Sequence, residues 1–225
     1  MTERPGAQLA RRPLHFVLLA DCSGSMAASG KMTALNTAIR EVLPQLAETS
    51  DNNPHAELLV RAIGFSTGAR WHVEHPTAPD ALDWQDLQPG GYTDLGAALD
   101  LLATVLTVPP MEERALPPAV VLVSDGMPTD DFAEALDRLL ALPWGASSVR
   151  MAVAIGQDAA YDTLSRFIGD PTIEPVTASN PEQLMMALRW ATVHVARAAS
   201  SISPPGPPPV QIATAWTDQA EDVVW

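Results

Sequence analysis

The sequence Leu14-His15-Phe16-Val17-Leu18-Leu19-Ala20 is followed at once by Asp21-Cys22-Ser23-Gly24-Ser25, and this junction decides the fold. The first seven residues form a short and almost continuous apolar run, which is typical of a strand that is buried on both faces. The next five predict a tight loop, in which Gly24 lets the backbone turn closely. A helix is expected over residues 32–47, because apolar residues recur there at helical spacing: Leu35, Ile39, Val42, Leu43 and Leu46.

The rest of the chain repeats this alternation of apolar strand and amphipathic helix. Further strands are predicted over 57–65, 69–73, 119–123 and 149–155, with a weak strand over 173–176. Helices are predicted over 94–106, 130–142, 161–168 and 181–199. The strands 57–65 and 69–73 are joined by a short turn and predict a hairpin. We therefore expect an α/β fold, with a doubly wound, mostly parallel sheet, helices on both faces and one antiparallel edge strand.

The two ends of the chain depart from this pattern. Residues 1–12 are predicted to be a disordered lead, residues 13–201 one α/β domain, and residues 202–225 a proline-rich linker and tail. The linker contains Ser-Pro-Pro-Gly-Pro-Pro-Pro at 203–209, which favours an extended spacer. The tail combines acidic residues with Trp216 and Trp225, so it can be interpreted as a flexible end or as a short docking peptide.

The composition argues against several classes of partner. The 225 residues include 13 Lys and Arg against 27 Asp and Glu, and the resulting net charge of −14 repels both nucleic-acid backbones and anionic lipid. We therefore expect no nucleic acid and no membrane as partner. Cys22 is the only cysteine, so no intrachain disulfide can form, and no apolar run approaches the roughly 18 residues that cross a bilayer. These features favour a cytoplasmic location.

An export signal is the alternative explanation of Arg11, Arg12, the apolar run and Cys22. The run has only about seven residues and is interrupted by His15, which places it at the lower end of the range for signal peptides. Asp21 stands where a small neutral residue should precede a lipid-attachment cysteine. A buried first strand explains the same residues better.

Three polar loops contain the candidate binding residues. Residues 21–25 and 124–126 directly follow predicted strands, and residues 90–94 directly precede a helix. Loops at the carboxyl ends of parallel strands gather at one edge of a sheet, and ligands bind there where the strand order reverses. The loops offer two carboxylates and three hydroxyls, all of them hard oxygen donors: Asp21, Ser23, Ser25, Thr93 and Asp125. Such donors favour Mg²⁺, or the related hard cations Mn²⁺ and Ca²⁺, over zinc or copper.

Each loop also has a plain structural interpretation when it is taken alone. Serine and glycine after a strand often form a simple turn, Thr93 can cap the helix that follows it, and Asp125-Gly126 is a common turn pair. The combination of all three at one sheet edge points to a metal site. Alternation supports this interpretation, because Asp21, Ser23 and Ser25 can point to the same side of an extended loop.

Asp21-x-Ser23-x-Ser25, followed by Thr93 and Asp125, resembles the metal-ion-dependent adhesion site of von Willebrand factor A-type (VWA) domains. The resemblance runs from about residue 12 to residue 201 and looks closest to the bacterial TerY-like, tellurite-resistance-type VWA proteins. It is carried by residues 18–26, 90–99 and 124–130, with one departure at Ser124, where related proteins often have Thr.

The resemblance implies a set of roles. Ser23, Ser25 and Thr93 would be metal ligands, and Asp21 and Asp125 would act directly or through water. A protein partner would supply an Asp or Glu to the ion. The resemblance also implies an association with a protein kinase and a phosphatase in a bacterial stress-response complex.

Two enzymatic alternatives fit the residues less well. A nucleotide-binding P-loop needs four residues between its glycines and a hydroxyl residue after its lysine, but five residues separate Gly24 from Gly30 and Met32 follows Lys31. A phosphatase that used Asp21 as nucleophile would need a general acid two residues later, where Ser23 stands. We therefore expect no enzymatic activity, with a metal-dependent hydrolase or a nucleotide-binding enzyme as the alternative.

Histidine and cysteine often bind metals, but here we expect these residues to have only structural roles. His72 and His75 would point to opposite faces of a strand, so we expect them to be solvated edge residues rather than metal ligands. Cys22 is expected to be a buried structural thiol, although a neighbouring cation could make it reactive.

Overall fold

The protein is built around one central sheet. The computed structural model describes residues 11–156 and 159–200. In this part of the chain the strands lie in the order β3-β2-β1-β4-β5-β6. Their bounds are β1 Arg12–Asp21, β2 Ala56–Ser66, β3 Gly68–Thr77, β4 Ala119–Ser124, β5 Val149–Ile155 and β6 Val176–Ala178. All neighbouring strands are parallel except β2 and β3, so the predicted fold class with one antiparallel edge is confirmed.

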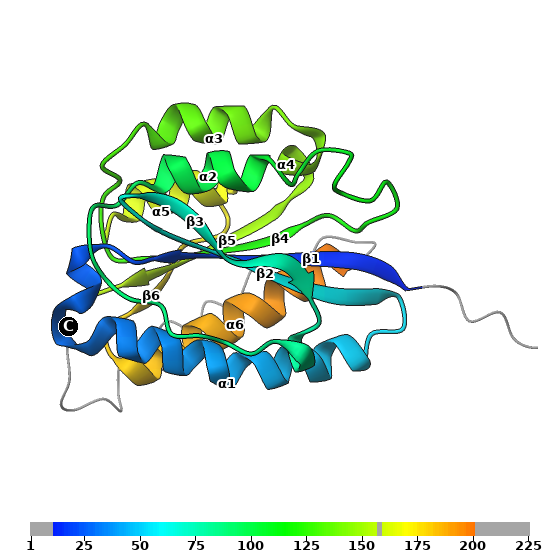
Figure 1. Ribbon diagram of the computed structural model, residues 1–225, viewed down its shortest axis with the longest axis horizontal. Coiled ribbons are helices and arrows are strands. Elements are labelled where there is room, and N and C mark those ends of the chain that lie inside the picture. The colour runs from blue at the N-terminus through cyan, green and yellow to red at the C-terminus, as the bar shows by residue number, and fades with distance from the viewer. Residues whose placement is uncertain (1–10, 157–158, 201–225) are drawn as a thin grey trace, which may run out of the picture.

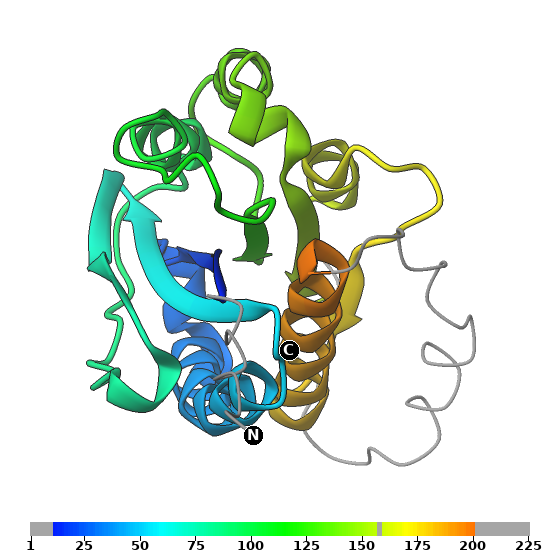
Figure 2. The same ribbon diagram turned by 90° about the vertical axis from the view of Figure 1, so that its right-hand side faces the viewer.

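Helices cover both faces of the sheet (Figures 1 and 2). The long helices α1 (Lys31–Asp51) and α6 (Pro181–Ser200) lie side by side on one face. The other face is covered by α2 (Leu95–Ala103), α3 (Phe132–Leu140) and α5 (Tyr161–Ile168), with the short α4 (Pro143–Ser147) beside them. Two 3₁₀ segments complete the described part, η1 (Gly24–Gly30) and η2 (Pro79–Ala81).

The central position of β1 follows from its apolar sequence. Successive side chains of a strand point to opposite faces. Phe16 and Leu18 therefore enter the core beneath α1 and α6, whereas Val17 and Leu19 enter the core beneath α2 and α3. Because both faces are covered, the run needs no polar residues at alternate positions. β4 is buried along its whole length for the same reason.

Several predicted boundaries were wrong, and local hydrogen bonds explain them. The helix predicted over 94–106 begins at Leu95 and ends at Ala103, because residues 104–106 form tighter turns with bonds from residue i to residue i+3. The helix predicted over 130–142 begins at Phe132, since the Asp131 side chain accepts a hydrogen bond from the Glu134 N–H as its cap. The weak strand predicted over 173–176 lies instead at Val176–Ala178.

The first strand begins earlier than its apolar run. Arg12, which was predicted to belong to the lead, already pairs with Ala56 of β2, and its guanidinium donates to the carbonyls of Arg114 and Ala115. The predicted lead at residues 1–10 and the predicted linker and tail at 202–225 lie outside the described residues.

The two strand histidines differ from one another. His75 is exposed, as predicted. His72 is half-buried, so its predicted solvation was wrong. Its ring packs on Trp84 with 4.4 Å between ring centroids, and its Nε2 lies 2.8 Å from the Gln85 carbonyl oxygen. The segment after β3 folds back over the strand and covers this side chain.

Candidate metal centre

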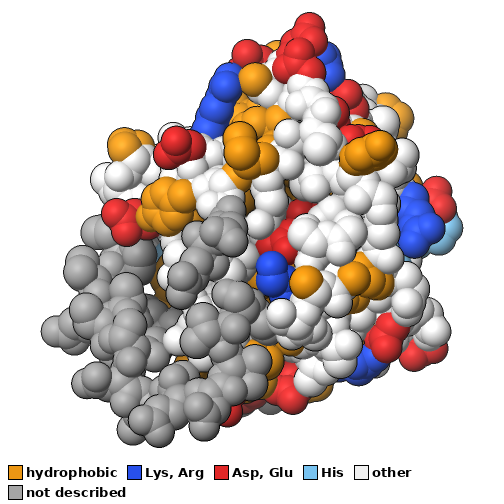
Figure 3. All heavy atoms as spheres, turned by 90° about the vertical axis from the view of Figure 1, so that its left-hand side faces the viewer, with side chains coloured by type: hydrophobic (Ala, Val, Ile, Leu, Met, Phe, Trp, Pro, Cys, Tyr) orange, Lys and Arg blue, Asp and Glu red, His pale blue; other side chains and the backbone are white. Residues whose placement is uncertain are grey.

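Three polar loops meet at the carboxyl edge of the parallel strands: the first at residues 21–25, the second at residues 90–94 and the third at residues 124–126. From β1 the chain passes through α1 to β2 on one side, and from β4 it passes through α3 to β5 on the other side. The strand order therefore reverses between β1 and β4, which is where open α/β sheets bind ligands. Figure 3 views this edge of the molecule, where acidic and basic side chains lie next to each other in a hollow near its centre.

A chain of hydrogen bonds joins three of the predicted oxygen donors. The Ser23 Oγ lies 2.9 Å from the Ser25 Oγ, and the Ser25 hydroxyl donates to Asp125 Oδ1 at 2.7 Å. Neighbouring ligands of an octahedral Mg²⁺ at its preferred bond length are also about 2.9 Å apart. The oxygens of Ser23, Ser25 and Asp125 therefore fit a common hard cation with little movement.

Asp21 connects the first loop to the end of β4 through hydrogen bonds to its carboxylate. Its Oδ1 accepts the Ser23 backbone N–H at 2.8 Å and its Oδ2 accepts the Ser124 hydroxyl at 2.6 Å. Burial raises the pKa of this carboxyl, while the hydrogen bonds from Ser124 and Ser23 oppose that rise. Because both oxygens already accept hydrogen bonds, Asp21 is suited to orient the two loops and to act on an ion through water.

Thr93 is buried and is held by Thr129, which lies three residues after the third loop. The Thr129 N–H donates to the Thr93 carbonyl at 2.9 Å, and the Thr129 Oγ1 accepts the Thr93 N–H at 3.0 Å. The same Thr129 hydroxyl donates to Asp94 Oδ1 at 2.8 Å. The Thr93 hydroxyl faces Gly126, where an added Cβ would lie 3.7 Å from it. Thr93 thus reaches the loop that contains Asp125.

Replacing Thr129 with valine is expected to weaken metal binding about ten-fold, because the variant loses the hydroxyl that holds Thr93 and Asp94 in place. Isothermal titration calorimetry with Mg²⁺ measures the change. Thr129→Ser is the matched control, since it keeps the hydroxyl and should bind like the wild type. Equal affinity of the valine variant and the wild type would show that Thr129 does not position the site.

The first and second loops are tied together by their backbones. The Gly24 N–H donates to the Gly91 carbonyl at 3.0 Å, and the Gly90 N–H donates to the Cys22 carbonyl at 2.7 Å. Gly91 has a φ of 87°, and a Cβ there would lie 2.5 Å from the Thr67 hydroxyl oxygen. Only glycine is suited to this turn. Cys22 is buried as expected, and burial raises the pKa of its thiol to about 12.

Four residues that surround the site were not among the predicted donors: Lys31, Asn36, Ser124 and Thr129. Lys31 forms an ion pair with Asp125. The buried Asn36 side chain accepts the Trp84 indole N–H and the Leu87 N–H and donates to the Leu87 carbonyl, which fixes the approach to the second loop. Asn36 could have been recognised in the sequence, because it is a polar residue within the apolar stripe of α1. Thr129 lies within the stretch 124–130 that carries the family resemblance, but the sequence did not indicate its partners, because they are 35 and 36 residues away.

The donors at this edge are mainly hydroxyls. Across residues 11–156 and 159–200, no group of three or more His, Cys, Asp or Glu side chains is placed to hold a metal ion. A cation at this edge would therefore need hydroxyl oxygens as well as carboxylates, and Ser23, Ser25 and Thr93 offer them. Such a site leaves the charge of an ion only partly neutralised, so the ion can attract a further acidic ligand.

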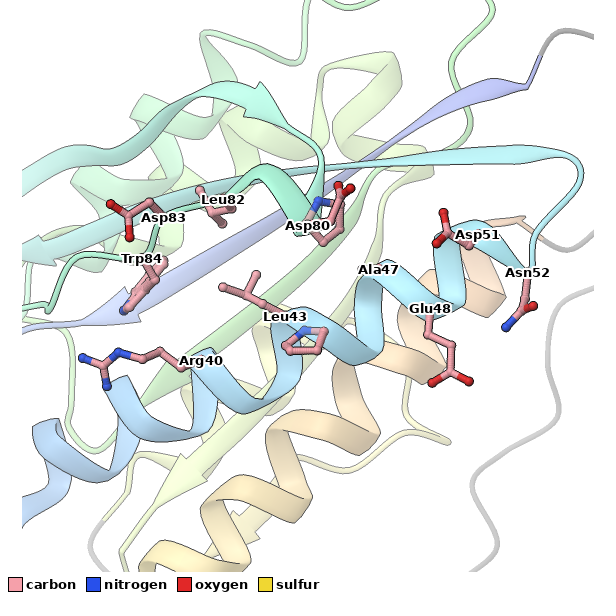
Figure 4. Close-up of a pocket in the computed structure, with 12 residues that line it drawn as sticks. Arg40, Leu43, Ala47, Glu48, Asp51, Asn52, Asp80, Leu82, Asp83 and Trp84 are labelled. Carbon is pink, nitrogen blue, oxygen red and sulfur yellow. The ribbon is translucent and has the colours of Figure 1, made fainter.

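A wide groove lies away from this edge, between α1 and the segment that contains η2 (Figure 4). Its walls combine apolar side chains such as Leu43 and Trp84 with charged ones such as Arg40 and Asp80. None of the five candidate donors lines it. The groove is therefore separate from the candidate metal centre.

The family model described as the von Willebrand factor type A domain matches residues 16–187 of the sequence. The chain belongs to this family. The match includes all five candidate donors and the strands and helices that position them. VWA domains are commonly protein-interaction modules that depend on a metal ion at their adhesion site.

Solved structures share the VWA fold at low sequence identity. A von Willebrand factor type A protein from Catenulispora acidiphila is 19% identical, with a TM-score of 0.62 over 82% of this chain and 43% of that one. Proximal thread matrix protein 1 from the mussel byssus, in a structure with a zinc-occupied adhesion-site motif, is 16% identical, with a TM-score of 0.64 over 83% and 48%. The pilus adhesin SpaC from Lactobacillus rhamnosus GG is 15% identical, with a TM-score of 0.65 over 85% and 32%.

The chain spans less than half the length of each of these three proteins. No curated protein matches the chain in sequence. Among the described residues of the VWA domain, no helix is long and apolar enough to cross a membrane.

Proposed function

We propose that this VWA domain holds one divalent cation with Ser23, Ser25 and Thr93, and uses the cation to bind a carboxylate of a protein partner. Asp21 and Asp125 support the ligands directly or through water. The observation that carries the proposal is the run of oxygens from Ser23 through Ser25 to Asp125, with separations of 2.9 and 2.7 Å. Mg²⁺ suits these donors, and Mn²⁺ and Ca²⁺ share its preference for oxygen.

The charge balance supports binding of an acidic group at the ion. The chain has a net charge of −14, so its surface in general repels acids. A divalent cation that is held by three neutral hydroxyls keeps much of its charge and creates one local site for an Asp or Glu. The ion would then restrict acidic partners to this one place on the surface.

The carboxylates around the site support binding rather than catalysis. Asp94 accepts the Gly68 N–H and the Thr129 hydroxyl, and Asp125 accepts the Ser25 hydroxyl and the Lys31 ammonium. Asp21 is engaged in the same way by Ser23 and Ser124. A general acid or base needs an oxygen that can reach the substrate, whereas these oxygens hold the loops together.

Two exposed apolar side chains stand beside the site. Tyr92 precedes Thr93 and is 66% exposed, and Met127 follows Asp125-Gly126 and is 72% exposed. Large apolar side chains that are exposed next to a polar centre are typical of interaction surfaces. We propose that the partner presents an Asp or Glu next to an apolar residue, which packs on Tyr92 or Met127.

Selection from a random peptide library tests this function. In Mg²⁺ the immobilised VWA domain is expected to enrich peptides that contain an Asp or Glu beside an apolar residue, and a chelator should release them. Asp21→Ala should enrich none. The double variant Tyr92→Ser, Met127→Ser should bind Mg²⁺ like the wild type but capture the selected peptides at least about ten-fold more weakly. Peptides without an acidic residue, or capture that persists in chelator, would contradict the proposal.

We propose that the partner belongs to a cytoplasmic stress-response complex that includes a protein kinase and a phosphatase. The resemblance of residues 18–26, 90–99 and 124–130 to tellurite-resistance-type VWA proteins supports this assignment. Cross-linking in the native cell, followed by mass spectrometry with and without Asp21→Ala, tests it. A kinase or phosphatase should be linked in a metal-dependent manner. Identical cross-links for Asp21→Ala and the wild type would exclude a role of the metal site.

A further inference from the structure

Lys31 is the only lysine in the 225-residue sequence, and its ammonium lies at the candidate metal centre. The Lys31 Nζ donates to Asp125 Oδ2 at 2.8 Å. The Lys31 side chain is 15% exposed and the Asp125 side chain is 0% exposed. The other oxygen of Asp125 accepts the Ser25 hydroxyl. One oxygen of the Asp125 carboxylate therefore contacts the Lys31 ammonium, and the other contacts Ser25, a proposed metal ligand.

The ammonium is held by this carboxylate rather than by its own helix. Lys31 is the first residue of α1, where the positive end of the helix dipole disfavours a cation. The side chain instead crosses toward the ends of the parallel strands. An added Cβ on Gly156, directly after β5, would lie 3.5 Å from the Lys31 Nζ. The absence of a side chain at Gly156 thus leaves room for the ammonium.

This ion pair differs from the others in the described part of the chain. The other pairs join arginines to acids on side chains that are largely exposed. Such surface pairs contribute little to stability. The pair of Lys31 with Asp125 is shielded from water, so the charge of each partner acts strongly on the other.

We infer that Lys31 is a tethered cation that occupies Asp125 when the site holds no metal and competes with the divalent ion for that carboxylate. This inference rests on the proposed function, because it concerns the same site. A divalent ion at Ser23 and Ser25 would lie close to the ammonium and be repelled by it. Movement of the ammonium away from Asp125 therefore favours metal binding, and the ion pair both preserves the metal-free loops and lowers the metal affinity.

Calorimetric titration of Lys31→Met with Mg²⁺ and Mn²⁺ tests the competition. Methionine has a side chain of similar length without the charge. The variant is expected to bind the metal about ten-fold more tightly than the wild type, because the repulsion is removed. Lys31→Arg, which keeps the charge, should bind the metal more weakly than Lys31→Met does. The metal-free methionine variant should melt at a lower temperature, and its melting point should rise more on addition of metal.

The single lysine allows the displacement to be followed in the unmutated sequence. Reductive methylation with ¹³C-formaldehyde keeps the positive charge and places one labelled side chain in the protein, and Lys31→Met separates its NMR signal from that of the N-terminus. Saturating Mg²⁺ is expected to shift the Lys31 signal in the wild type and to leave it unchanged in Asp21→Ala.

The outcomes separate this inference from the function on which it rests. If the wild type binds metal but Lys31→Met binds equally or more weakly, the competition is refuted and the metal site stands. A Lys31 signal that does not move while calorimetry records binding also refutes the displacement. If neither protein binds a divalent ion, the proposed function fails and the inference fails with it.

Discussion

Replacing Thr93 with valine is expected to reduce the affinity for Mg²⁺ by about 100-fold or more, because the variant loses a direct ligand while it keeps the shape of the side chain. Asp21→Ala should have a similar effect, since Asp21 accepts hydrogen bonds from both Ser23 and Ser124 and so joins the first and third loops. Isothermal titration calorimetry on metal-free protein measures both changes.

A thermal-melting series gives an independent measure of the same prediction. An ion that binds only the folded state stabilises it by about 2.7 kcal/mol at a concentration of 100 times its dissociation constant. The wild type should therefore melt at a higher temperature in millimolar Mg²⁺, whereas Thr93→Val should not respond. Thr37→Val is the control, because the exposed Thr37 hydroxyl donates only within α1 to the Thr33 carbonyl. An unchanged metal response in both Thr93→Val and Asp21→Ala would falsify the site.

The second large effect is expected at His15, which lies in β1 and is only 5% exposed. Neither of its ring nitrogens has a hydrogen-bond partner among the described residues. Burial, with a smaller contribution from the nearby Arg61, lowers the pKa of His15 from 6.5 to about 4. The folded protein thus favours the neutral ring.

This shift makes the free energy of unfolding depend on pH. Above pH 6.5 His15 is neutral in both states and contributes no pH dependence. As the pH falls from 6.5 to about 4, His15 becomes protonated in the unfolded chain but stays neutral in the folded chain. The free energy of unfolding therefore decreases. The loss amounts to about 3 kcal/mol when the change in pKa is converted to free energy.

Urea unfolding of the wild type and of His15→Leu at several pH values tests this prediction. The leucine variant should lose less stability between pH 6.5 and 4, and the difference between the two proteins should grow toward the acid end of this range. His55→Leu is the control, because it removes an exposed imidazole instead of the buried one. Parallel pH profiles for the wild type and His15→Leu would mean that another group causes the loss.

The elements that the sequence predicted well are those whose pattern is local. The strand Val149–Ile155 and the helix Tyr161–Ile168 have the bounds that were expected, and the hairpin turns at Ser66-Thr67-Gly68. Apolar periodicity and a turn residue such as Gly68, with a φ of 74°, act over a few residues and can be recognised in the sequence. Boundaries such as the start of α3 failed because a single capping side chain decides them.

By itself, the sequence determined the α/β fold and the edge of the sheet at which the polar loops meet. The apolar strand must be buried in the sheet, whereas Asp21, Ser23 and Ser25 must lie at its polar edge. Because β1 pairs with β4, Asp125 then lies beside them. Only the tertiary structure decided what surrounds these donors. Lys31 pairs with a residue 94 positions away, and Thr129 holds Thr93 from 36 positions away. Such contacts depend on where the completed fold brings distant side chains, and no local pattern in the sequence encodes them.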